Sequence, residues 1–455
     1  MSKKSNTKVA PVDEKLPLSQ LLMFGFQHVL VMCAGGVAVS LIIGNTLGLS
    51  REQIVFLINA DLLMAGVATL IQSLGLKGFA GAKAPLIEGA SMAAVGSMVA
   101  IGLQYKSDAS LALGTIFCAT FAAGLIGLII APFFGKLLRF FPKVVTGTVI
   151  TTMGICLIPV AIKWSANNNL TSPESKNIFL ALFVLVTILI LNKVLKGVWN
   201  NIAILLGLII GTIVASMFHM VDYSGVVQAK WISFDMPFYF GKFNFDITAV
   251  ISMTLVMIVI MTQATGNIIA LHEIVGKPLD EKTLVRGLRT DNLTTMIGGM
   301  FNTFPRTALG QNIGLVNMTG VKSRYTGAAA GAILLVLGFF PKFAALVAAI
   351  PNPVLGGAGF MMFGMIMIGG IKTLGSVQLD GTKNGIIIAV SIGISMITLI
   401  IPDFYKGFPS WVNTIFQSGM TTGCITAIVL NLVFNEFGSK KKAELEAEKE
   451  VAAGA

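Results

Sequence analysis

The segment Pro305-Arg306-Thr307-Ala308-Leu309-Gly310-Gln311-Asn312 interrupts a predicted membrane span with proline, glycine, a cation and two amides. An earlier span is interrupted in the same way by Pro85-Leu86-Ile87-Glu88-Gly89-Ala90-Ser91. Backbone groups freed by such breaks cannot face lipid, so they must be buried in protein or line a water-filled cavity. The two segments therefore predict a transporter whose binding site lies at membrane depth.

Composition places the rest of the chain in the membrane. Of 455 residues, 55% are hydrophobic and 12% are charged, and the mean hydropathy is +0.83. No water-soluble domain of this length could bury so much apolar surface. The net charge of +11 does not indicate a nucleic-acid partner, because the basic residues are scattered between apolar runs and form no patch. We expect an all-α polytopic protein in a lipid bilayer.

A spanning helix needs about 20 apolar residues, and the sequence predicts fourteen spans, several of them short. They cover residues 18–42, 54–75, 84–103, 111–132, 144–162, 178–195, 200–219, 247–271, 284–301, 307–320, 326–350, 354–371, 385–401 and 411–434. With both termini cytoplasmic, the inside segments hold most of the 32 lysines and arginines, in agreement with the positive-inside rule. Only Arg306 falls within the membrane, and we see no removable signal peptide.

The order of the spans indicates an internal duplication. The polar stretch from His219 to Asp246 leaves seven predicted spans on each side, and the interrupted span is the third of each half. Because seven is odd, the two halves would be inverted relative to one another. The four cysteines lie in apolar spans at unrelated spacings, so they predict neither disulfides nor a metal site. They are Cys33, Cys118, Cys156 and Cys424.

Four motifs together resemble the nucleobase-ascorbate transporter family, also called nucleobase:cation symporter-2. They are Gln27-His28, Gln263-Ala264-Thr265-Gly266-Asn267, the run from Gly287-Leu288-Arg289-Thr290-Asp291 to Gly298-Gly299-Met300-Phe301-Asn302-Thr303-Phe304-Pro305, and QNIGLVNMT at 311–319. The match covers nearly all of residues 18–435. Within the family, the chain looks most like the bacterial urate and xanthine permeases.

The resemblance implies a fold of two inverted seven-span repeats, with short extended strands in spans 3 and 10. It implies a core domain (18–132 and 247–350) and a gate domain (133–246 and 351–438), between cytoplasmic tails at 1–17 and 439–455. It also implies a homodimer formed through the gate domain in the cell membrane. Transport would proceed by alternating access, as the core moves against the gate.

Gln311 combines a carbonyl acceptor with an amide donor, the complement of a base edge that carries adjacent N–H and C=O groups. By resemblance it binds substrate; the alternative is a glutamine that satisfies the ends of the broken helix. The other positions predicted to bind substrate are Gln263, Met92, Ser91, Gly266, Asn267, Gln27 and His28. Asn312, Gly314 and Thr319 are predicted to support the site.

The chain departs from the family pattern at five positions. The family usually has a glutamate at the position of Gln263, and that acid is held to bind substrate and take part in proton coupling. Gln263 can bond to a base but cannot carry a proton. An aspartate often stands at the position of Asn267 in xanthine-selective members, and a phenylalanine is usual where Met92 stands. Ser40 replaces a usual proline and His272 a usual glycine.

The coupling proton therefore needs another carrier. A carboxyl group in a low-dielectric site exchanges a proton more readily at physiological pH than one in water. The candidates are Asp291, Glu88, Asp61 and His28. Asp291 could instead cap a helix near the cytoplasmic side, and His28 could stay neutral and bond to a neighbouring span.

Glu88 and Arg306 occupy similar places in the two interrupted spans. If the two strands cross, these charges would form a buried pair, since an unpaired buried charge is very costly. The alternative places both at water-accessible mouths of the cavity.

The sequence predicts a secondary transporter that imports a purine such as urate or xanthine with a proton. One alternative is an uncoupled or otherwise coupled facilitator for uracil or another base. A second is an anion exchanger of the same fold, with Arg306 holding the anion between helix N-termini. An enzyme is not supported, since the sequence shows no metal-ligand cluster, nucleophile elbow or phosphate-binding loop. We predict no cofactor and no metal.

Overall fold

The computed structural model describes residues 10–105, 108–134, 142–234, 236–405, 407–409, 412, 416 and 419–437. Its contacts divide the chain into unit 1, Met1–Pro132 with Val160–Met362, and unit 2, Phe133–Pro159 with Phe363–Ala455. Every residue that the sequence predicts for the site belongs to unit 1. The predicted charged tail 439–455 lies outside the described residues, and the predicted core and gate domains remain a prediction.

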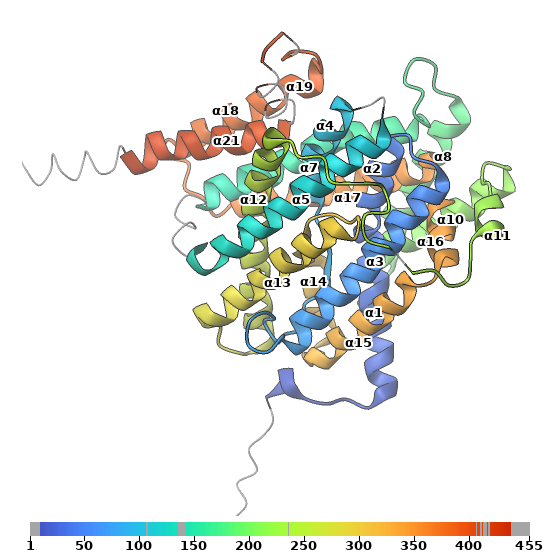
Figure 1. Cartoon of the computed structure of the whole chain (residues 1–455), viewed down its shortest axis with the longest axis horizontal. Coiled ribbons are helices and arrows are strands. Elements are labelled where there is room, and N and C mark those ends of the chain that lie inside the picture. Colours follow the sequence, from blue (N-terminus) through green and yellow to red (C-terminus); the bar gives the residue numbers. More distant parts are fainter. Residues whose placement is uncertain are drawn as a thin grey trace, which may run out of the picture. The chain divides into compact units, whose positions relative to one another are not determined.

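Regular structure in both units is mostly helical (Figure 1). The helices of unit 1 are η1 (Pro11–Asp13), α1 (Leu18–Gly36), α2 (Ala38–Thr46), α3 (Arg51–Leu74), η2 (Met92–Ala94), α4 (Val95–Gln104), α5 (Ala109–Ile130), α8 (Ser175–Val194), α9 (Val198–Asn201), α10 (Ala203–Met217), α11 (Ser224–Gln228), α12 (Ile247–Val275), α13 (Glu281–Met300), α14 (Gly310–Thr319), α15 (Arg324–Gly338) and α16 (Pro341–Ala348). Those of unit 2 are α18 (Asn384–Ser395), α19 (Ile397–Ile400), α21 (Gly419–Asn431) and η5 (Leu432–Phe437). Helices η3 (Ala131–Phe133), α7 (Lys143–Ser165) and α17 (Asn352–Leu374) run through the boundaries.

Each of the predicted spans contains a helix. By length and hydropathy, seven helices among the described residues could cross a membrane, or eight if α15 and α16 count as one span bent by 84°. Pro341 opens α16 and lacks the N–H that would continue α15, which accounts for the bend. The chain is therefore a multi-pass helical membrane protein, and the finer count of fourteen remains a prediction.

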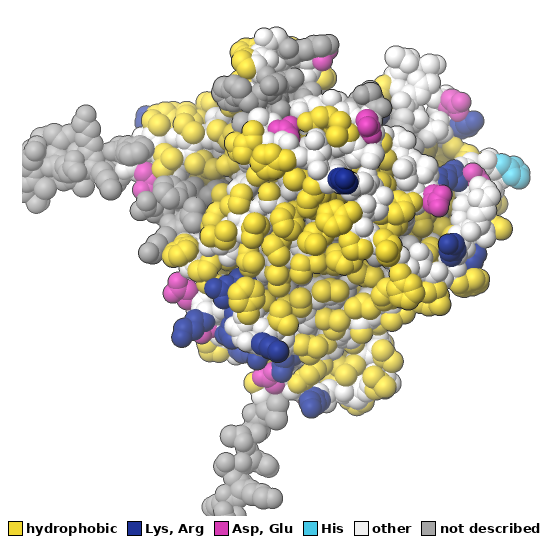
Figure 2. All heavy atoms as spheres, viewed as in Figure 1, with side chains coloured by type: hydrophobic (Ala, Val, Ile, Leu, Met, Phe, Trp, Pro, Cys, Tyr) yellow, Lys and Arg dark blue, Asp and Glu magenta, His cyan; other side chains and the backbone are white. Residues whose placement is uncertain are grey.

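The surface is that of a protein surrounded by lipid. Figure 2 shows apolar side chains over most of the face viewed, with most of its lysines and arginines toward the lower and right-hand edges. Large apolar side chains such as Ile129, Phe179 and Ile213 are more than half exposed. In water this would be unfavourable, whereas in a bilayer it is the ordinary composition of a lipid-facing helix.

The two interrupted segments form short strands that pair with each other. Strand β1 (Glu88–Ala90) runs antiparallel to β2 (Arg306–Ala308), with Glu88 opposite Ala308 and Ala90 opposite Arg306. The flanking bonds run from Leu309 N–H to Ile87 O at 2.9 Å and from Ser91 N–H to Pro305 O at 2.8 Å. The strands fall within the two segments where proline and glycine predicted a break. Each strand thus satisfies backbone groups that lipid could not.

Close helix packing holds the strands in place. Helix α3 packs on α15, and α13 packs on α5. A Cβ added to Gly66 of α3 would lie 2.6 Å from Leu335 N and 2.7 Å from Gly331 O of α15. A Cβ added to Gly124 of α5 would lie 2.4 Å from Met296 N of α13. Only glycine fits at these two positions, because any Cβ would collide with the backbone of the neighbouring helix. Such close approach strengthens the packing between helices in lipid.

Candidate functional site

The face expected to recognise a base is built from α12, η2 and the first turn of α14. Helix α12 packs against η2, β2 and α14, so the predicted ligands from three distant parts of the chain come together. Asn267 Nδ2 on α12 donates to Ala308 O at 2.8 Å, and a Cβ on Gly310 would lie 3.4 Å from Asn267 Oδ1. Asn267 therefore fixes the start of α14 against α12.

Open space adjoins this face. Gln311 is exposed and Gln263 is half-buried. A Cβ built on Gly266 or Gly314 would meet no atom within 4 Å. Among the described residues, no hydrogen bond engages the side chain of Gln263 or Gln311. The two amides are therefore available to a ligand, as the sequence predicts for a substrate site.

Ser91 and Met92 enter the face from the end of β1. The Ser91 hydroxyl accepts from Ala93 N–H at 3.3 Å and so caps η2. Met92 is half-buried and supplies an adaptable wall. The structure thus gives Ser91 a capping contact, and its predicted contact with substrate remains a prediction.

Asn312 and His28 bond to each other across α14 and α1. Asn312 Nδ2 donates to His28 O at 2.9 Å and lies 3.1 Å from His28 Nδ1. The carbonyl fixes the amide with its NH₂ group toward His28, so Nδ1 must accept, which requires a neutral ring with its proton on Nε2. This contact matches the neutral alternative for His28 and the supporting role predicted for Asn312. Gln27 beside it is half-buried, and its Oε1 lacks a partner among the described residues.

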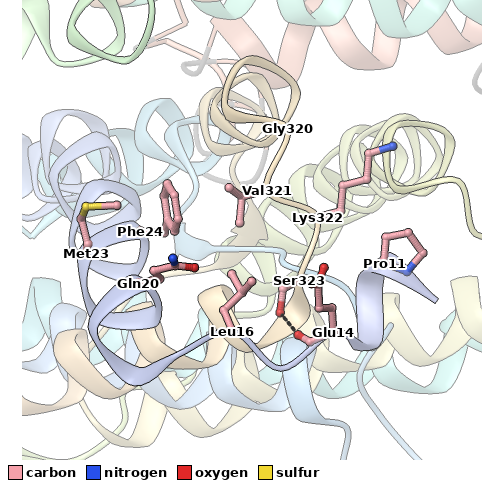
Figure 3. Close-up of a pocket in the computed structure, with 10 residues that line it drawn as sticks. All are labelled: Pro11, Glu14, Leu16, Gln20, Met23, Phe24, Gly320, Val321, Lys322 and Ser323. Atoms are coloured by element: carbon pink, nitrogen blue, oxygen red, sulfur yellow. Dashed lines mark hydrogen bonds between the residues drawn. The ribbon is translucent and has the colours of Figure 1, made fainter. Parts of the chain in front are cut away.

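The other end of α14 is a separate region. Thr319 Oγ1 donates to Leu315 O at 2.8 Å, and Gly320 ends the helix at φ 67°. Figure 3 shows a pocket of about 330 Å³ there, where the Ser323 hydroxyl donates to Glu14 O at 2.6 Å. Gly320 of this pocket lies nine residues after Gln311, a helical rise of about 14 Å, so the pocket lies apart from the Gln311 amide.

The predicted ion pair between Glu88 and Arg306 is wrong. Arg306 Nη2 lies 2.5 Å from Asp61 Oδ1, and it also donates to Asp61 O at 2.9 Å and to Thr303 Oγ1 at 2.5 Å. The strand register explains the error, because Glu88 faces Ala308 across the sheet and lies diagonal to Arg306. All three charged side chains are fully buried, so neither charge lies at a water-accessible mouth as the alternative held.

Glu88 instead meets Asp291 of α13 through Gln72 of α3. Gln72 Nε2 donates to Glu88 Oε1 at 3.1 Å, to Asp291 Oδ1 at 3.0 Å and to Gly287 O at 3.1 Å. Gln72 Oε1 accepts from Ala82 N–H at 3.0 Å, which fixes the orientation of the amide. Asp291 is not the cap of its helix.

The cap of α13 is Asp280, whose side chain accepts from Thr283 N–H at 3.0 Å. Asp291 lies well inside the helix and is fully buried. The capping alternative for Asp291 is therefore wrong.

The sequence reasoning missed Gln72, Thr69 and Thr303. A signal for the first two is present, because Asp61, Thr69 and Gln72 are spaced by eight and three residues and so share one face of α3. No local sequence signal indicates the role of Thr303, since its partner Asp61 lies 242 positions away.

Comparison with known proteins gives consistent matches. The sequence model of a family described as "Permease family" matches residues 19–404. The uric acid transporter UacT of Escherichia coli is 41% identical over 429 residues, which cover 94% of this chain and 88% of that protein. The xanthine permease of Bacillus subtilis is 39% identical over 434 residues, covering 94% and 96%. The uric acid permease PucK of Bacillus subtilis is 42% identical over 422 residues, covering 91% and 95%.

Solved structures share the fold at low sequence identity. The transmembrane domain of the cyanobacterial bicarbonate transporter BicA has a TM-score of 0.61 at 15% identity, covering 92% of this chain and 100% of that one. The murine Solute Carrier 26 family member A9 anion transporter in the inward-facing state has a TM-score of 0.62 at 13% identity, covering 95% and 73%. At such identities the likeness establishes the fold alone.

Proposed function

Because the chain belongs to the xanthine/uracil permease family of membrane transporters, we propose that it imports a purine nucleobase, urate or xanthine, across the cell membrane by proton symport. The observation that carries this proposal is the pair of unbonded amides, Gln263 and Gln311, beside the open space at Gly266 and Gly314. Purines present adjacent N–H and C=O groups, which an amide side chain matches with one donor and one acceptor. The relatives named as uric acid and xanthine permeases support the substrate class.

We further propose fourteen spans in two inverted repeats, with both termini cytoplasmic. Helix contacts support this arrangement, since each contact described below has an equivalent when the two predicted halves are exchanged. Seven spans separate α3 from α13 and α5 from α15, and the contact of α3 with α15 matches that of α13 with α5. The contact of α1 with β1 likewise matches that of α12 with β2. Movement of a core against a gate within a homodimer would then give alternating access.

An anion exchanger is the less favoured reading. An anion exchanger would need the guanidinium of Arg306 to hold the anion. In the structure that guanidinium bonds to Asp61 and Thr303 and is fully buried. A cation already neutralised by a carboxylate is a poor anion site. The likeness to anion transporters concerns the fold alone.

The proposal is tested with purified protein in liposomes. Uptake of labelled xanthine, urate and uracil is measured with an inward proton gradient and again with a protonophore. We expect saturable purine uptake that the protonophore reduces to equilibration. Uptake of no base would refute the substrate class, and purine uptake that ignores the gradient would leave an uncoupled facilitator.

Gln311→Ala tests the site itself. This change removes a hydrogen bond to the purine and leaves a polar group of the bound purine without a partner. Such a loss costs about 1–3 kcal/mol, or about 5- to 150-fold in affinity. Asn317→Ala on the same helix is the matched control, because Asn317 is exposed and lies six residues, about 1.7 turns, further along. Equal effects of the two changes on KM would contradict the role of Gln311.

A further inference from the structure

Glu88 and Asp291 form a carboxyl pair inside the protein. Both side chains are fully buried, and both accept from the single Gln72 amide, at 3.1 Å for Glu88 Oε1 and 3.0 Å for Asp291 Oδ1. Glu88 Oε2 and Asp291 Oδ2 have no donor among the described residues. Two ionised carboxylates that share one donor repel each other and offer only acceptors, so a proton on one of them removes the repulsion and supplies a donor.

The surrounding charges leave this pair unbalanced. The charged groups near Glu88 are Asp291 from α13, Arg306 from β2 and Asp61 from α3. Arg306 is neutralised by Asp61 at 2.5 Å. From α1, His28 is held neutral by its bond to Asn312. No cation within this group is left for Glu88 and Asp291, so the pair is stable in the dry interior only with a bound proton.

A single residue of β2 connects the pair to the substrate face. Ala308 lies opposite Glu88, between the bonded pairs on either side, so its own backbone groups point away from β1. Its C=O accepts from Asn267 Nδ2 at 2.8 Å. A ligand that draws Asn267 toward itself therefore acts on the strand residue that lies opposite Glu88.

We propose that Glu88 and Asp291 together bind the proton that is transported with the substrate, in place of an acid at Gln263. This inference rests on the proposed symport. One proton is taken up by the pair from one side of the membrane and released to the other, and no covalent bond of the substrate changes. Glu88 is the new member of this site, since the break in the third span places its carboxyl group on the same Gln72 amide that bonds Asp291.

The test compares wild type, Glu88→Gln and Thr69→Val in liposomes. Thr69 is the matched control: its hydroxyl accepts from Glu88 N–H at 3.0 Å, so its loss disturbs the same residue but spares the carboxyl pair. Two assays are run, xanthine accumulation driven by a pH gradient and xanthine counterflow at equal pH. We expect Glu88→Gln to lose accumulation completely and to keep counterflow, while Thr69→Val keeps both.

The outcomes distinguish failure of the proposed symport from failure of the proposed proton site at Glu88 and Asp291. If wild type does not accumulate xanthine, the symport is refuted and the proton pair with it. If wild type and Glu88→Gln both accumulate, only the proton pair is refuted. Infrared spectroscopy of wild type gives a readout that needs no variant. A C=O stretching band of a protonated carboxyl group is expected at neutral pH, and its absence would overturn the inference even if Glu88→Gln fails to insert.

Discussion

The Asp61–Arg306 ion pair gives a direct test of how this chain holds charge inside the membrane. Both side chains have no exposed surface, and their closest atoms are 2.5 Å apart. Asp61→Asn preserves the shape of the side chain but leaves the guanidinium without its counter-charge. Removing one partner of a buried pair costs about 3–5 kcal/mol. We expect a sharply lower unfolding temperature and less folded protein in the membrane.

The matched control is Asp222→Asn. Asp222 pairs with Arg51 at 2.8 Å, but the two side chains are 56% and 51% exposed, and exposed pairs contribute about 0.2–1 kcal/mol. Both variants are followed by thermal unfolding in the same detergent. Adding Arg306→Met to Asp61→Asn removes the orphaned charge and should recover part of the loss. An unchanged unfolding temperature for Asp61→Asn, or losses that simply add in the double variant, would refute the reasoning.

Three further outcomes follow from named contacts. Gly66→Val should force α3 from Leu335 of α15 and cost about 1–3 kcal/mol in unfolding measurements, as overpacking does. Asn312→Ala should cost about 1–3 kcal/mol, because it leaves the buried Nδ1 of His28 without a donor. Asp246→Ala should cost about 0.5–2 kcal/mol, because Asp246 caps α12. Partial burial tends to raise the pKa of Asp246, but the hydrogen bonds at this cap outweigh it, so the pKa lies below its ordinary value. Its contribution should be complete above about pH 3.9 and be lost as pH falls through the lower folded value.

The sequence is sufficient to locate the two strands. Proline, glycine and polar residues inside apolar runs identify both breaks, and the strands lie within them at Glu88–Ala90 and Arg306–Ala308. The free amide at Gln311 follows from the same reasoning. These features depend on local composition and on the cost of unsatisfied groups in lipid.

The partners of the buried charges could not be predicted in the same way. Arg306 finds Asp61 across 245 positions of sequence, and the choice between Asp61 and Glu88 depends on the strand register. A shift of two residues in that register would place Arg306 directly opposite Glu88. No local pattern distinguishes the two registers, because both segments are short and fully buried.

The proposed position of the proton pair has a consequence for how transport is coupled. With Gln263 on α12, no residue of the substrate face both holds the base and carries the proton. The two ligands would communicate through Ala308, whose C=O bonds to Asn267 and which lies opposite Glu88 in the sheet. Substrate affinity and proton coupling then depend on different side chains, so Gln311→Ala should raise KM while uptake still follows the proton gradient, and Glu88→Gln should do the reverse. A transporter that kept an acid in the substrate face could not separate these effects, because one change would abolish both.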